Sequence, residues 1–126
     1  MRRIAISIAA ALAWAGSPSV QAHAETIDVY DDHGGVVPEY DARWAALAAR
    51  GVNVRIVGPC QSACTVLLAH IPYDHICVTP QARFGFHQAK FPRSTEMMWA
   101  GYSQGIRDWI NARGGLTPDF KWMGAP

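Results

Sequence analysis

The residues best suited to chemistry lie between Gly58 and His87. Ser62 follows a predicted strand and opens a predicted helix, and His87 ends a later predicted strand. A serine hydroxyl becomes nucleophilic at neutral pH only when a base lies beside it, and histidine is the usual base. The start of a helix also presents unpaired amides and the positive end of a dipole, which stabilise an oxyanion. The pair therefore predicts serine-type acyl transfer.

Each of the two residues also has a plain structural interpretation. A serine at the start of a helix is most often an N-cap, whose oxygen accepts a bond from a backbone amide. A lone histidine in a strand is more often structural than reactive. In the predicted strand, Phe84 and Phe86 share one face, whereas His87 shares the opposite face with Gly85. A polar residue beside two buried aromatic residues usually faces a cleft or a partner.

The same stretch contains all three cysteines of the chain. Three cysteines leave at least one unpaired. A structural disulfide between the predicted helix and the strand of Cys77 is favoured, with Cys60 and Cys64 as rival partners of Cys77. A thiol-redox role would call for CxxC rather than the CxxxC spacing found here. A zinc site with His70, His75 and Cys77 fits no common ligand spacing, so no metal and no cofactor are expected.

The segment before the serine predicts a strand, a helix and a second strand. Thr26–Tyr30 alternates polar and apolar residues, as does the segment 52–57. Between them, Pro38 suits the first position of a helix and Gly51 the position after its last turn. Such an order favours a right-handed βαβ unit and an α/β fold with a largely parallel sheet.

The rest of the chain alternates short elements. A helix is predicted from Ser62 to about His70, strands at Ile76–Val78 and Arg83–His87, and a long helix from about Thr95 to Ala112. Gly115–Pro126 then ends without a predicted closing element. Either this tail docks on another subunit, or the reading frame is truncated relative to its relatives; truncation is favoured.

Residues 1–24 have the layout of a secretory signal peptide. Arg2 and Arg3 precede an apolar run, Ile4–Ala15, that is too short to span a bilayer as a permanent helix. Small residues then mark a cleavage site between Ala24 and Glu25, although an uncleaved anchor is the alternative. We expect export to the periplasm, with residues 25–126 forming one domain.

The charge balance excludes some classes of partner. Without its two N-terminal arginines, the chain carries nine Lys and Arg residues against ten Asp and Glu residues. No basic patch indicates binding to nucleic acid or to an anionic membrane surface. No later apolar run approaches the length that a membrane span requires.

Four short motifs carry a resemblance to a known family. They are Gly34-Gly35, Gln61-Ser62-Ala63-Cys64, the strand around Cys77 that ends at Pro80, and Gly85-Phe86-His87-Gln88. In this order, and with 25 positions between serine and histidine, the chain resembles the Clp protease proteolytic subunit of the Clp/crotonase superfamily. It is similar above all to exported bacterial Clp-like proteins with Cys-x-Ser-Ala-Cys and Gly-Phe-His motifs. The resemblance covers about residues 26–88 well and the last predicted helix loosely.

The resemblance implies a Clp/crotonase-like fold with repeated ββα and βαβ units. It also implies Ser62 as nucleophile and His87 as general base, with the amides of Gly35 and Ala63 forming the oxyanion hole. A peptide or protein substrate and a homo-oligomeric assembly would follow. The expected activity is peptide hydrolysis.

The sequence departs from the family in two places. The family's third triad residue, an aspartate, would fall beyond Pro126, which leaves Asp108 and Asp119 as weak candidates. Cys64 and Thr65 stand where the family has a glycine shortly after the serine. The alternative function is therefore a non-catalytic Clp-like scaffold or binding protein that lacks the triad acid, and a thiol-redox protein is the third.

Overall fold

A computed structural model describes residues 10–17 and 24–126. Most of the predicted signal peptide, including the start of its apolar run and the residues before its cleavage site, lies outside these ranges. Residues 10–17 form neither helix nor strand. Among the described residues, no helix combines the length and the apolar character needed to cross a bilayer.

The first sheet contains three parallel strands in the order β1-β2-β4. They are β1 (Thr26–Val29), β2 (Asn53–Ile56) and β4 (Ile76–Val78), with β2 in the middle. The crossover from β1 to β2 runs through α1 (Val37–Ala49), with proline in its first turn as predicted. Parallel neighbours require such a crossover. The predicted α/β class and largely parallel pairing are confirmed here.

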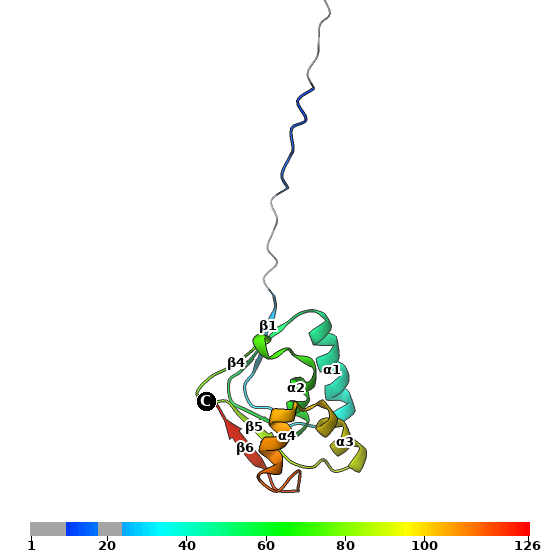
Figure 1. Cartoon of the computed structure of the whole chain (residues 1–126), viewed down its shortest axis with the longest axis vertical. Coiled ribbons are helices and arrows are strands. Elements are labelled where there is room, and N and C mark those ends of the chain that lie inside the picture. Colours follow the sequence, from blue (N-terminus) through cyan, green and yellow to red (C-terminus); the bar gives the residue numbers. More distant parts are fainter. Residues whose placement is uncertain (1–9, 18–23) are drawn as a thin grey trace, which may run out of the picture.

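A second three-stranded sheet has the order β3-β5-β6. In it, β3 (Pro59–Gln61) pairs in parallel with β5 (Arg83–Phe86), and β5 pairs antiparallel with β6 (Lys121–Gly124). Figure 1 shows β6, in red, beside β5. The expectation of a tail without a closing element is therefore wrong. A four-residue strand is too short to show in the hydrophobic pattern, and its pairing with β5 supplies the backbone hydrogen bonds that fix it.

The predicted long helix over residues 95–112 is wrong as well. The chain forms α3 (Pro92–Gly101), breaks at Tyr102, and resumes as α4 (Gln104–Asn111). Tyr102 has an extended backbone, with ψ of 142°, and its side chain is buried. Ser103 then caps α4, because its Oγ accepts a hydrogen bond from the Ile106 amide at 3.3 Å.

The helix predicted after the serine begins as a tighter turn. Residues Ser62–Val66 form a 3₁₀ helix, η1, which continues into the single α-turn α2 (Leu67–His70). A second 3₁₀ turn, η2 (Tyr73–His75), leads into β4. The 3₁₀ geometry packs more turns into a given number of residues than an α-helix does, so η1 brings Cys64 back toward the end of β3.

Two clusters of buried side chains hold the sheets and helices together. In the first, Trp44 of α1 packs with Val54 and Ile56 of β2. The second surrounds Phe86 of β5, which is fully buried and meets the ring of Tyr102 edge-on, with centroids 5.2 Å apart. Burial of Phe86 fixes the face of β5 and therefore turns the next residue, His87, the other way.

Replacing Phe86 by alanine should lower the free energy of unfolding by about 3 to 5 kcal/mol, because it empties the centre of the second cluster. Phe91, which is 63% exposed, offers a matched control: Phe91→Ala should change the value by less than about 0.5 kcal/mol. Urea denaturation followed by tryptophan fluorescence would measure both. Equal losses in the two variants would contradict this account of the core.

Candidate active site

Ser62 and His87 lie side by side at the ends of two neighbouring parallel strands. Strand β3 ends at Gln61, which pairs with Gly85 of β5, so the residues just after these strands emerge at the same sheet edge. His87 Nε2 lies 2.8 Å from Ser62 Oγ, and both residues are partly exposed. The structure therefore brings together the two residues that the sequence singled out.

The backbone of Ser62 adopts an uncommon conformation. Its φ is 55°, and no other non-glycine residue among those described has a positive φ. The N-cap position of η1 belongs to Gln61, with no side-chain capping bond, so Ser62 does not serve as the expected N-cap. A left-handed serine costs conformational energy, and residues held in this way cluster at functional sites. The conformation aims Oγ at His87 instead of at the helix amides.

A pair of buried hydroxyl groups, on Thr65 and Tyr102, holds the turn that begins at Ser62 (the serine turn, residues 62–66). This contact was not predicted from the sequence. Thr65 Oγ1 donates to the Ser62 carbonyl at 2.6 Å, so its one proton is used there. Tyr102 Oη, also 2.6 Å from Thr65 Oγ1, is therefore the donor in the second bond. Burial raises the pKa of Tyr102 to about 12, which keeps the phenol protonated. Nothing in the spacing of these two residues signals the contact.

A disulfide joins Cys60 to Cys64 and so brackets the serine turn. Both cysteines are fully buried. The predicted disulfide to Cys77 is wrong, because β4 pairs with β2 in the other sheet and leaves Cys77 as an exposed free thiol. The 3₁₀ turn brings the two nearer cysteines within bonding distance instead.

The glycine pair packs directly against the serine turn. Gly34 has φ of 84°, and a side chain there would come within 2.8 Å of the Gln61 carbonyl oxygen and 2.9 Å of the Ala63 amide. Only glycine fits a position with both constraints. The Gly35 amide donates no hydrogen bond to another described residue, and Ala63 lies in the first turn of η1, where amides lack an intrahelical acceptor. Both amides thus lack a backbone acceptor within the described chain.

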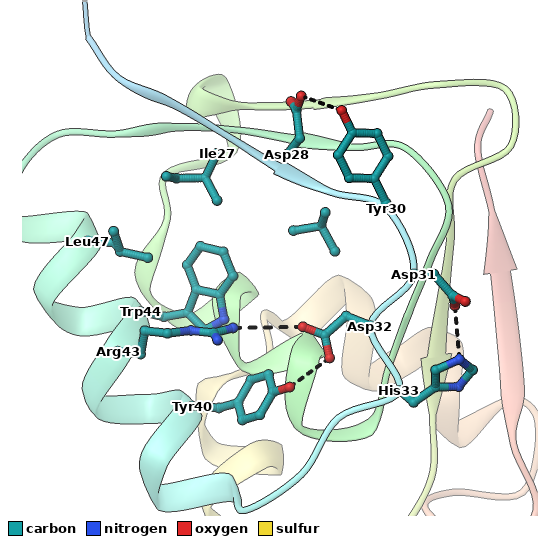
Figure 2. Close-up of a pocket in the computed structure, with 11 residues that line it drawn as sticks. Ile27, Asp28, Tyr30, Asp31, Asp32, His33, Tyr40, Arg43, Trp44 and Leu47 are labelled. Carbon is teal, nitrogen blue, oxygen red and sulfur yellow. Dashed lines mark hydrogen bonds and ion pairs between the residues drawn. The ribbon is translucent and has the colours of Figure 1, made fainter.

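The Asp32 side chain links the Gly34-Gly35 turn to α1, and Figure 2 shows it facing Tyr40 and Arg43 of that helix. Its Oδ1 accepts hydrogen bonds from the Gly34 amide at 2.9 Å and from Tyr40 Oη at 2.7 Å, and Arg43 lies 3.7 Å from Oδ2. Its backbone is tied to β3, because the Asp32 amide donates to the Pro59 carbonyl at 2.9 Å. Asp32 comes two positions before Gly34, the spacing at which an aspartate side chain accepts from the backbone amide in a turn.

Two open cavities adjoin this arrangement. The larger, about 510 Å³, lies between β1 and α1 and contains the Asp32 side chain. The other, about 430 Å³, borders the Gly35 end of the site and is lined mainly by apolar residues, including Val36, Val37 and Phe91. A bound acyl group whose carbonyl faced the Gly35 amide would have this apolar cavity beside it.

His87 is surrounded by the segment before β6. Its ring stacks on Phe120, with centroids 3.9 Å apart and 16° between the planes. Burial lowers the pKa of His87 below its usual 6.5, and a hydrogen bond to the Pro118 backbone acts in the opposite direction. A lowered pKa keeps the imidazole neutral near pH 7, the form in which it accepts a proton.

Neither aspartate suggested as the third triad residue reaches His87. Asp108 is exposed on α4, where it accepts a hydrogen bond from Gln104 Nε2 at 2.7 Å. Asp119 is exposed in the loop before β6 and makes backbone contacts with Thr117. Their suggested role is therefore not supported by the geometry: within the described chain, no carboxylate hydrogen bonds to the imidazole.

The histidines considered as zinc ligands, His70 and His75, each contact a different partner. His70 Nε2 lies 2.6 Å from Asp41 Oδ1, and His75 Nδ1 lies 3.2 Å from the Val52 carbonyl oxygen. In residues 10–17 and 24–126, no three His, Cys, Asp or Glu side chains gather closely enough to bind a metal ion.

Comparison with known proteins assigns no relative: no family model matches the chain, and no curated protein matches it. The features on which function can be argued are therefore those of the chain itself, a mixed α/β protein with a hydrogen-bonded serine–histidine pair.

Removing the disulfide with Cys60→Ala and Cys64→Ala together should lower the free energy of unfolding by about 2 kcal/mol, the value expected for so short a closed loop. Cys77→Ala is the matched control and should change it by less than about 0.5 kcal/mol. Thiol titration of the native chain should find one reactive cysteine, lost in the control variant. Two or three reactive thiols under oxidising conditions would contradict the pairing.

Proposed function

We propose that this protein is a serine hydrolase in which Ser62 is the nucleophile and His87 the general base. The observation that carries the proposal is the 2.8 Å contact between Ser62 Oγ and His87 Nε2, made by a serine whose backbone is held in a left-handed conformation. Separation and orientation both suit transfer of the hydroxyl proton to the imidazole.

The reaction would proceed in two stages. Ser62 Oγ attacks the substrate carbonyl as His87 Nε2 takes its proton, and the resulting oxyanion accepts hydrogen bonds from the amides of Gly35 and Ala63. The protonated imidazole then gives its proton to the leaving amine, and the bond to that amine breaks. Water, activated by the same imidazole, attacks the acyl-serine and restores the free hydroxyl.

Short or unfolded peptides are the proposed substrates. The resemblance of the sequence to the Clp proteolytic subunit supports this class, and so does the partial exposure of Ser62 and His87. The apolar cavity beside Gly35 favours an apolar side chain next to the scissile bond. A Clp/crotonase-type fold and a homo-oligomeric assembly form part of the same proposal.

Export to the periplasm also belongs to the proposal. The layout of residues 1–24 supports it, and the Cys60–Cys64 disulfide is compatible with it, since such bonds persist in oxidising compartments.

A fluorophosphonate probe tests the nucleophile directly, because it phosphonylates only an activated serine. The purified protein should be labelled once, on the peptide that contains Ser62, and Ser62→Ala should abolish both labelling and peptide hydrolysis. Ser103→Ala is the control: it removes a helix cap on α4 but should leave labelling intact. Mass spectrometry of the digested protein locates the label.

Labelling elsewhere, or peptide hydrolysis that survives Ser62→Ala, would remove the proposal. A folded chain that is neither labelled at Ser62 nor active on a peptide library would favour the non-catalytic scaffold instead.

Labelling should depend on pH through His87. The imidazole acts as a base only when neutral, and burial lowers its pKa, so the neutral form persists into mildly acidic solution. The labelling rate should rise with pH to a plateau, with its midpoint below 6.5, the usual histidine value. Circular dichroism over the same range checks that the protein stays folded. A midpoint above 6.5 would show that the charged form is favoured and would contradict this account.

A further inference from the structure

Three residues of the loop that precedes β6 lie around His87. The Gln88 amide donates to the Thr117 carbonyl at 2.8 Å, and the imidazole stacks on Phe120. The backbone of Pro118, between these two residues, lies near enough to the ring to act on the pKa of His87. These contacts place residues 117–120 around the imidazole, whose Nε2 faces Ser62. In a hydrolytic triad the acid meets the other ring nitrogen, Nδ1.

We propose that the main-chain carbonyl of Pro118 takes the place of the triad acid: it accepts a hydrogen bond from His87 Nδ1 and so directs Nε2 toward Ser62. This inference rests on the proposed function, since it assigns the group that orients the base of that reaction. Pro118 is a positioning residue, because its carbonyl acts on the substrate only through His87.

The chemistry of the two groups fixes the direction of each bond. Proline has no backbone N–H, so its backbone bond to the imidazole must use the carbonyl oxygen, which only accepts. Nε2 faces Ser62, so the nitrogen left for this carbonyl is Nδ1, and Nδ1 must carry the proton. A neutral imidazole has one N–H, and Nε2 is then the nitrogen with a free lone pair for the serine proton.

A carbonyl differs from a carboxylate in charge. It sets the tautomer and the ring orientation as an aspartate does, but it stabilises the imidazolium less because it carries no full negative charge. The lowered pKa of His87 agrees with this, since burial outweighs the carbonyl. We expect a weaker base than in a full triad, and therefore slow turnover.

The pairing of β6 with β5 brings the segment that contains the Pro118 carbonyl next to His87. Trp122 lies opposite Gly85, and continuing this register places Phe120 opposite His87. Planar groups stack along this face: Arg83 lies 4.2 Å from the Trp122 ring centroid, and Trp122 stacks on Phe120 at 5.4 Å. Gly85 leaves room for the stack, because a side chain there would approach the indole to 2.8 Å.

Nitrogen NMR of the ¹⁵N-histidine-labelled protein reads the tautomer without any assay of activity. At about pH 8, where a histidine is neutral, long-range ¹H–¹⁵N correlations should show His87 protonated at Nδ1 and unprotonated at Nε2. The difference spectrum against His87→Gln assigns the signals. A His87 protonated at Nε2, in a protein that is still labelled at Ser62, overturns the inference and leaves the proposed function standing.

Amino-acid substitutions show whether the Pro118 carbonyl or a nearby aspartate orients His87. Asp108→Asn and Asp119→Asn should leave the tautomer and the fluorophosphonate rate unchanged, whereas a loss in either variant would show that a carboxylate orients the histidine. Phe120→Ala should release the ring, so that both tautomers appear and the limiting labelling rate falls at least about tenfold. The probe concentration for half-maximal rate should stay the same, since binding is not affected.

Tyr73→Ala, which removes another exposed aromatic residue, is the control for Phe120→Ala and should change neither reading. An unchanged tautomer and rate in Phe120→Ala would overturn the role given to the loop. If the unmodified protein is never labelled at Ser62, the proposed function fails, and the role of Pro118 fails with it whatever the tautomer.

Discussion

The parallel pairing of β3 with β5 is the constraint on which the site depends. It sets Gln61 beside Gly85, and because parallel strands point the same way, the next residue of each strand leaves the sheet at the same edge. The serine and the histidine, 25 positions apart in sequence, thereby become neighbours without any long side chain having to reach. A slip of this register by one residue would turn His87 to the face that Phe86 now occupies in the core.

Each side of the site is then fixed by a different kind of force. Covalent closure between Cys60 and Cys64 and the buried Thr65–Tyr102 hydroxyl pair hold the serine turn. Ionic and hydrogen bonds to Asp32 hold the glycine turn. Stacking holds the histidine. Short elements of three to five residues, which have little stability of their own, are ordered because these local restraints converge on them.

Sequence reasoning predicted correctly those elements that hydrophobic periodicity and the positions of proline and glycine mark. The strand–helix–strand start followed from alternation and from the positions of proline and glycine. The pairing of Ser62 with His87 followed from their residue types and from the resemblance to the Clp family. The sequence-based predictions were wrong where tertiary contacts outweigh the local hydrophobic pattern. The long helix breaks at Tyr102, where the backbone is extended and the side chain is buried in the second cluster. The disulfide does not include Cys77, because β4 joins the other sheet. The loop around His87 escaped notice because a backbone carbonyl leaves no trace in the residue types.

The position of β6 in the chain has a consequence for how the protein matures. Ser62 and His87 are synthesised well before residues 118–124, which stack against the histidine and complete the second sheet. An elongating chain thus holds both reactive groups before it holds the segment that orients them. Until β6 has been synthesised and has paired with β5, the imidazole lacks the Phe120 ring on which it stacks, so the geometry of the serine–histidine pair becomes fixed only at the last step of folding.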